Sequence, residues 1–325
     1  QKLEPETVRP LIQESLALLE RSVDRSYHQQ NCFTCHHSGT AVRILNEAIQ
    51  HRFVVNEDLL LRQMQRAYER LAHNIPRFTK GNFERGKADV LGLCLLVLGE
   101  AGYPPDAVTD NGVDFLLTHD NRQDYWTSER VRPPLEGSDF TATLRVVRAL
   151  KLHQAESSSK RLTGVKKWVL THPASDTEDQ VSRLRLLREM DAPAKAIKEA
   201  TEQLLAGQRN DGGWGQAAFL NSDPYATGSV LATLVESGDI NTSYPAWQQG
   251  AKFLMDTREH DGSWHVKSRV RKVRPHYESG FPHGGDQFAA HAIEIQASGT
   301  LGREVERLGQ GGEPALAIGP VRRGR

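Results

Sequence analysis

A repeated segment in the second half of the chain constrains the fold more than any other feature of the sequence. Residues 204–214 read LLAGQRNDGGW, and residues 254–264, 50 positions later, read LMDTREHDGSW. A fainter copy upstream joins Leu116 and Leu117 to Trp126. Each copy closes one apolar helical segment and precedes another. Since such a unit buries its apolar face only by packing against its neighbours, the chain is expected to consist of stacked helical units.

Apolar residues at helical spacing, interrupted by Gly, Pro and Asp, predict six helix pairs in this chain of 325 residues. First helices such as 194–208 have a charged face, whereas several of the second helices are apolar on most sides. A charged face is typical of a surface helix, and apolarity all round is typical of burial on both sides, so an all-α fold with two concentric rings is expected. The first helices are predicted at 7–22, 57–74, 111–119, 161–171, 194–208 and 245–257, and the second at 39–50, 87–102, 140–153, 179–190, 225–237 and 286–298.

The segment from Gln208 to Trp214 resembles the QW repeat of the squalene cyclase and protein prenyltransferase superfamily. This resemblance covers residues 85–298 well and the rest of the chain weakly. It implies an α/α toroid of about six helical hairpins, with inner and outer rings of helices. In that superfamily the Gln and Trp brace turns between helices and do not bind substrate. One toroid domain is expected over 1–298, followed by a flexible, glycine-rich tail over 299–325.

Squalene-type cyclases protonate an alkene with an Asp from an acidic D-x-D-D-T-A run at the start of an inner helix. The matching positions here are Asp139 and Asp223, which are the candidate catalytic carboxylates of the resemblance. Each lacks the acidic neighbour that would raise its power to donate a proton. Both precede an apolar helix, where an Asp caps free N–H groups. The sequence therefore predicts capping for both residues and no terpene cyclisation.

The strongest chemical signal in the sequence is a C-x-x-C-H motif formed by Cys32, Cys35 and His36. This is the attachment signature of c-type haem, because two thiols one turn apart can add to the two vinyl groups of one porphyrin. The motif resembles cytochromes c over these few residues and predicts covalent haem c, with His36 binding the iron. Zinc held by the two thiols with His36 or His37, and a redox dithiol, are the alternatives.

A long connection between 265 and 285 is the best candidate for a functional loop. It carries five cations within residues 267–274, followed by two His and two aromatic residues. In a toroid this connection and the haem-attachment loop at 31–37 would meet at one rim, so haem is expected at the mouth of a central cavity. His283 is expected to be catalytic and to bind the iron opposite His36, because Pro282 and two glycines shape a tight turn there. Further haem contacts are expected from His37, Arg274, His276 and Tyr277.

Composition excludes two classes of partner. With 41 Lys and Arg against 41 Asp and Glu, no bulk charge attracts the chain to nucleic acid. The longest apolar run, ten residues over 90–99, is well below the ~20 that a membrane span needs.

The haem motif sets the function that the sequence predicts. Haem of this type is attached outside the cytoplasm, and the chain starts without Met, so a periplasmic or otherwise exported location is expected. The expected function is that of a mono-haem oxidoreductase acting on a small molecule. The alternatives are an electron-transfer cytochrome with a redox partner protein, and a toroid that binds a ligand or protein with zinc at the Cys/His cluster.

Overall fold

The chain is all-helical in the part that its computed structural model describes, apart from two isolated β-bridges. The described residues are 5–29, 33, 35–83, 87–119, 123–128, 133–134, 137–155, 158–267, 269 and 280–283. The helices in these residues are α1 (Pro5–Gln29), the π-helix η1 (Cys35–Thr40), α2 (Ala41–Gln50), α3 (Glu57–Phe78), α4 (Lys87–Glu100), α5 (Ala107–Thr118), α6 (Asp139–Leu152), α7 (Ser159–Thr171), α8 (Thr177–Glu189), α9 (Ala194–Ala206), α10 (Pro224–Glu236) and α11 (Pro245–Asp256).

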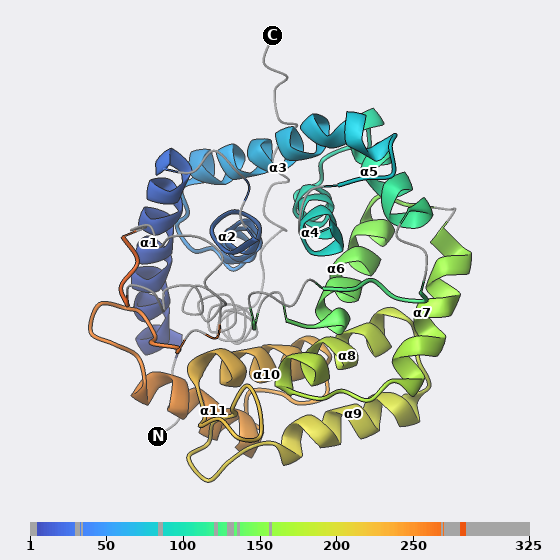
Figure 1. Ribbon diagram of the computed structural model, residues 1–325. Coiled ribbons are helices and arrows are strands. Elements are labelled where there is room, and N and C mark those ends of the chain that lie inside the picture. The colour runs from blue at the N-terminus through green and yellow to red at the C-terminus, as the bar shows by residue number, and fades with distance from the viewer. Residues whose placement is uncertain are drawn as a thin grey trace.

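The helices alternate between two rings, as Figure 1 shows. The odd-numbered helices α1 to α11 form the outer ring, and α2, α4, α6, α8 and α10 form the inner ring. Burial follows the predicted pattern. Most of α10 is buried, whereas α9 buries only Ala200, Thr201 and Leu204. The prediction of an α/α toroid is confirmed, and none of the described helices is long and apolar enough to cross a membrane.

The tryptophans of the repeated segments brace the ends of outer helices. The indole N–H of Trp214 donates to the carbonyl of Leu204 at 2.7 Å, and that of Trp264 donates to the carbonyl of Leu254 at 2.7 Å. Trp126 makes the same bond to Leu116 at 3.2 Å. Each indole is buried, and each bond goes to a carbonyl in the last turn of an outer helix, where the regular hydrogen bonds of the helix end. The structural role that the repeat predicts is therefore confirmed for the three copies.

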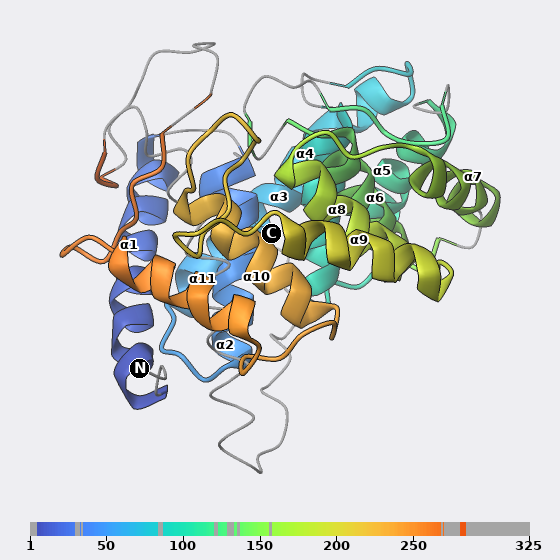
Figure 2. The ribbon, with the colours of Figure 1, turned by 90° about the horizontal axis from the view of Figure 1, so that it is seen from below.

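The last repeated turn closes the ring on the first helix. In the earlier turn, Gln208 donates to the carbonyl of Ala246 at the start of α11, at 2.7 Å. Arg258 occupies the equivalent place and donates to the carboxylate of Glu14 in α1 at 2.8 Å. The hydroxyl of Ser15 in α1 in turn donates to the carbonyl of Gly262 at 2.6 Å. Figures 1 and 2 both show α1 beside α11, so the two ends of the ring meet without a covalent link.

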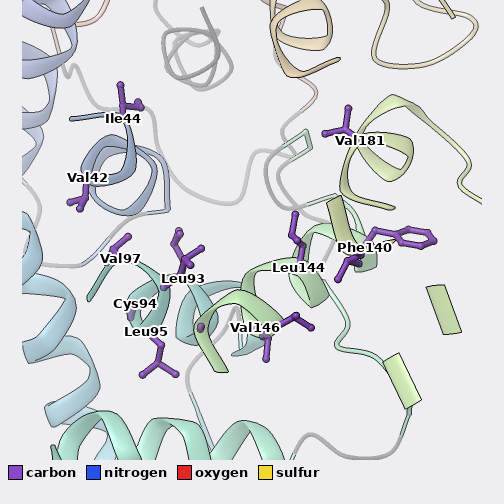
Figure 3. Close-up of a cluster of buried hydrophobic side chains, with 14 of the residues drawn as sticks. Val42, Ile44, Leu93, Cys94, Leu95, Val97, Phe140, Leu144, Val146 and Val181 are labelled. Carbon is purple, nitrogen blue, oxygen red and sulfur yellow. The ribbon is translucent and has the colours of Figure 1, made fainter. Parts of the chain in front are cut away.

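Apolar side chains fill the space between the rings and extend inward. Phe140 packs outward against Trp168, with ring centroids 4.4 Å apart. Leu93, Leu144 and Val181 project from α4, α6 and α8 toward a common centre, as Figure 3 shows. The predicted helix 286–298 and the predicted tail 299–325 lie outside the described residues, so the division at 298 stays a prediction.

Candidate active site

Three neighbouring inner helices begin side by side, and each is capped by a polar side chain. Ser138, Asp176 and Asp223 accept hydrogen bonds from backbone N–H groups in the first turns of α6, α8 and α10, respectively. The first turn of a helix leaves its N–H groups without partners in the helix, so these caps determine where each helix begins. The side chains of the three first turns are thereby held within reach of one another.

Glu178, in the first turn of α8, joins the three helices. Its Oε1 accepts a hydrogen bond of 2.6 Å from the Thr141 hydroxyl of α6, and its Oε2 accepts one of 2.7 Å from the Tyr225 hydroxyl of α10. The Ser182 hydroxyl lies 2.8 Å from that of Thr141. Because Thr141 gives its one proton to Glu178, Ser182 is the donor in this second bond. These four residues are called the Glu178 cluster below.

The environment of Glu178 suits a proton donor. Burial raises the pKa of the carboxyl, while the hydrogen bonds from Thr141 and Tyr225 act to lower it. Glu178 is half-buried as a residue, and both of its carboxyl oxygens are occupied by these hydrogen bonds. A carboxyl of this kind holds a proton closer to neutral pH than an exposed one does, and the two hydroxyl donors stabilise the carboxylate that remains after transfer.

The two Asp residues at the positions of the cyclase pattern accept hydrogen bonds from backbone N–H groups and are not part of the Glu178 cluster. Asp223 caps α10 as predicted and also accepts from the backbone N–H of Gln216 at 3.2 Å, and burial raises its pKa. Asp139 accepts from the backbone N–H of Ser128 at 2.9 Å. The cap of α6 is Ser138 and not Asp139, which is already the first residue of that helix. The prediction that Asp139 is a cap is therefore wrong.

A second set of charged side chains lies at the other end of the inner helices. Glu236, in the last turn of α10, accepts from Arg148 at 2.7 Å and from Arg185 at 3.0 Å. Arg148 also pairs with Glu189 at 2.8 Å. The two guanidinium groups outweigh the effect of burial and lower the pKa of Glu236 to about 2. This set is called the Glu236 network below.

Most of the predicted haem site cannot be placed. Cys32, Arg274, His276 and Tyr277 lie outside the described residues. Cys35, His36 and His37 belong to η1, but their side chains lie outside the description as well. Covalent haem, zinc in its place and export of the chain therefore stay predictions.

His283 lies at the ring-closing turn, where the described residues do not supply a metal site. Its Nε2 is 2.8 Å from the Ser263 hydroxyl, and its ring is 4.9 Å from that of His265. Nearby Phe281 packs against Leu18 of α1. In the described parts of the chain no group of three or more His, Cys, Asp or Glu could hold a metal ion. Because the side chain of His36 lies outside the description, the iron-binding role of His283 stays a prediction.

Comparison with known proteins identifies the fold. No family model and no curated protein matches the chain. A solved structure of a type II terpene cyclase, a variant of MstE from Scytonema in complex with geranylgeranyl dihydroxybenzoate, matches with a TM-score of 0.51 and 14% identity, over 88% of this chain and 98% of that one. A possible member of the GH105 family from Salmonella enterica matches with a TM-score of 0.58 and 10% identity, over 95% and 96%. A protein from Actinoplanes matches with a TM-score of 0.51 and 15% identity, over 89% and 98%.

These neighbours overturn the function predicted from the sequence. At this identity they show the fold alone, yet the structures that share the ring include type II terpene cyclases, which the sequence analysis excluded. The predicted haem oxidoreductase, its electron-transfer and zinc-binding alternatives and the exclusion of terpene cyclases are therefore wrong as a statement of function. The cause is the weight given to one motif of five residues, which says nothing about the ring that makes up most of the chain.

Sequence reasoning also missed Glu178. The second helix of the fourth pair was predicted to begin at 179, whereas α8 begins at Thr177, so Glu178 fell into the preceding loop. A usable signal was present in the acidic pair Glu178 and Asp179, which begins two positions after Asp176 and is typical of the first turn of a helix. Only the structure shows that Thr141 and Tyr225 face this carboxyl.

Proposed function

We propose that this chain is an enzyme that acts on a small unsaturated molecule by general acid catalysis, with Glu178 as the proton donor. One observation carries the proposal. Glu178 is half-buried, burial raises the pKa of its carboxyl, and each carboxyl oxygen accepts a hydrogen bond from a hydroxyl group of a different helix. A positioned acid with these properties contributes about 10²–10⁴-fold to a reaction rate.

The proposed reaction begins with transfer of the Glu178 proton to one carbon of a substrate double bond. A cation forms at the other carbon, and the carboxylate left behind is stabilised by the Thr141 and Tyr225 hydroxyls. Loss of a proton from the cation, or capture of water, completes the reaction. In the first case the carboxylate can recover the proton directly, and in the second the proton released by water restores it. No net charge or electron is left over.

The side chains next to the Glu178 cluster favour an apolar substrate. Leu144 follows Thr141 by three residues on α6, and Val181 follows Glu178 by three residues on α8, so each lies on the same helix face as its polar neighbour. Both project toward the centre of the ring with Leu93 (Figure 3). The terpene cyclase from Scytonema with this fold was solved with geranylgeranyl dihydroxybenzoate, which supports polyprenyl compounds as the first class to test.

The experiment is an incubation of the purified chain with squalene and with shorter polyprenyl substrates in D₂O. The wild-type chain is expected to give a product that carries deuterium at the protonated carbon, because the proton of Glu178 exchanges with solvent. Glu178→Gln keeps the shape of the side chain but has no acidic proton, so the rate should fall by about 100-fold or more.

Glu202→Gln is the matched control. Glu202 lies on the outer helix α9 with 63% of its side chain accessible, and its substitution should leave the rate unchanged. Full activity in Glu178→Gln would overturn the role of that residue. A folded wild-type chain that gives no product from any of these substrates would overturn the proposed substrate class.

A further inference from the structure

A buried ion pair lies one helical turn from the Glu178 cluster. Arg145 follows Thr141 by four residues on α6, so the two side chains share a face of that helix. The NH1 group of Arg145 lies 3.4 Å from Oδ1 of Asp89, in the first turn of α4. The side chains of Arg145 and Asp89 are only 9% and 2% accessible.

Stability alone does not account for this pair. Removing two charges from water costs several kcal/mol per ion, and apolar side chains of similar volume in such a place are often as stable or more stable. Leu144, Val146 and Leu91, which lie within two positions of the pair along α6 and α4, are all buried. A costly pair one helical turn from the Glu178 cluster points to a role at that carboxyl.

Other charged and titratable groups also face Glu178, from each helix around it. Asp176, which precedes α8, raises the pKa of the carboxyl, and Tyr225 of α10 is its hydrogen-bond donor. Arg185 of α8 interacts with Glu178 too, but its guanidinium is bound to Glu236 at 3.0 Å. Arg145 acts on both Glu178 and Tyr225, with the sign that favours their ionised forms.

We propose that Arg145, held in place by Asp89, is a positioning residue whose charge stabilises the Glu178 carboxylate left after proton transfer. Asp89 keeps the guanidinium beside the cluster and at the same time offsets part of its field. The pair thus lets Glu178 hold a proton before the reaction and release it to the substrate. This inference rests on the proposed function for its meaning, but it can be tested on the carboxyl itself.

The test is a titration of the Glu178 carboxyl by ¹³C NMR of the full chain labelled at glutamate side-chain carbons, with the signal assigned by its loss in Glu178→Gln. The central variant is the double substitution Asp89→Asn with Arg145→Met, which removes both charges of the pair together. In this double variant the midpoint of the Glu178 titration should rise by about one pH unit, because a cation near the carboxylate is lost. Arg145→Lys keeps the charge, so its midpoint should stay close to that of the wild type.

The control is a second ion pair of the inner helices, between Arg43 of α2 and Glu100 of α4 at 2.8 Å. Arg43→Met with Glu100→Gln should leave the midpoint where it is. An unchanged midpoint in the Asp89/Arg145 double variant, or equal shifts in both double variants, would overturn the inference. The titration does not depend on turnover, so a wild-type chain without activity would count against the proposed function only.

Discussion

Glu178 and Glu236 are both glutamates of the inner ring, and their surroundings give them opposite properties. Glu178 lies in the first turn of α8 and accepts hydrogen bonds from the neutral hydroxyls of Thr141 and Tyr225. Glu236 lies in the last turn of α10 and is bound by the guanidinium groups of Arg148 and Arg185. The pKa of the first carboxyl is raised, and that of the second is lowered to about 2.

The helix dipole would produce the reverse order. A carboxylate is stabilised at a helix N-terminus, where Glu178 lies, and destabilised at a C-terminus, where Glu236 lies, by about 0.3–1 kcal/mol. The charges of the immediate partners therefore decide the outcome in this ring. Neutral donors leave Glu178 able to carry and deliver a proton, whereas two cations make Glu236 a permanent anion that joins helices.

The largest expected effect is the loss of stability in Glu236→Gln. The substitution leaves Arg148 and Arg185 without their shared carboxylate, and breaking a fully buried pair costs about 3–5 kcal/mol. Because the side chain of Glu236 is 30% accessible, solvent screening reduces the expected loss to about 2–3 kcal/mol in the free energy of unfolding at pH 7. Urea denaturation measures it. Glu202→Gln should change the value by less than about 0.5 kcal/mol, and an equal loss in both variants would refute the role of the Glu236 network.

A somewhat smaller effect is expected in acid. The folded pKa of Glu236 is below the ordinary value of 4.5, so the stability that this residue contributes is present above pH 4.5 and lost as the pH falls through about 2. With allowance for screening, this loss is about 1–2 kcal/mol. Urea denaturation between pH 2 and 7 should show the wild-type and Glu236→Gln curves converging as the pH falls. Parallel curves would show that Glu236 is not the group that titrates.

Much of the fold could be predicted because its signals are local. The repeated segments 204–214 and 254–264 marked the braced turns, and the contrast between charged and apolar helices separated the outer ring from the inner one. Both signals depend on residues a few positions apart. The closing contact between Arg258 and Glu14 could not be found in this way, because the two residues are 244 positions apart.

The candidate site was harder to predict for the same reason. Thr141 and Tyr225 are 37 and 47 positions from Glu178, and each hydrogen bond depends on how two inner helices are placed. A search for a run of adjacent Asp residues led instead to Asp139 and Asp223, whose carboxylates accept hydrogen bonds from backbone N–H groups. Local motifs report local geometry, so they located helix starts but not the carboxyl that three helices share.

The smallest expected effect has the opposite sign and concerns Glu178→Gln. Because burial raises the folded pKa of Glu178 above the ordinary value of 4.5, its carboxyl favours the folded state most at low pH and loses that advantage as the pH rises through the folded pKa. At pH 7 the variant should therefore be as stable as the wild type or more stable, by at most about 1 kcal/mol. Part of the gain is offset because the amide nitrogen of Gln cannot accept, so the hydrogen bond from either Thr141 or Tyr225 is lost. Urea denaturation at pH 4 and pH 7 compares the two chains, and the difference between their free energies of unfolding should move in favour of Glu178→Gln at the higher pH.

Tyr225→Phe separates the effect of the carboxyl from that of its hydrogen bonds, because it removes one hydrogen bond and keeps the carboxyl. This variant should lose stability at pH 7. If Glu178→Gln loses as much stability at pH 7 as Glu236→Gln does, then Glu178 is a structural anion like Glu236, and the contrast between the two glutamates does not hold.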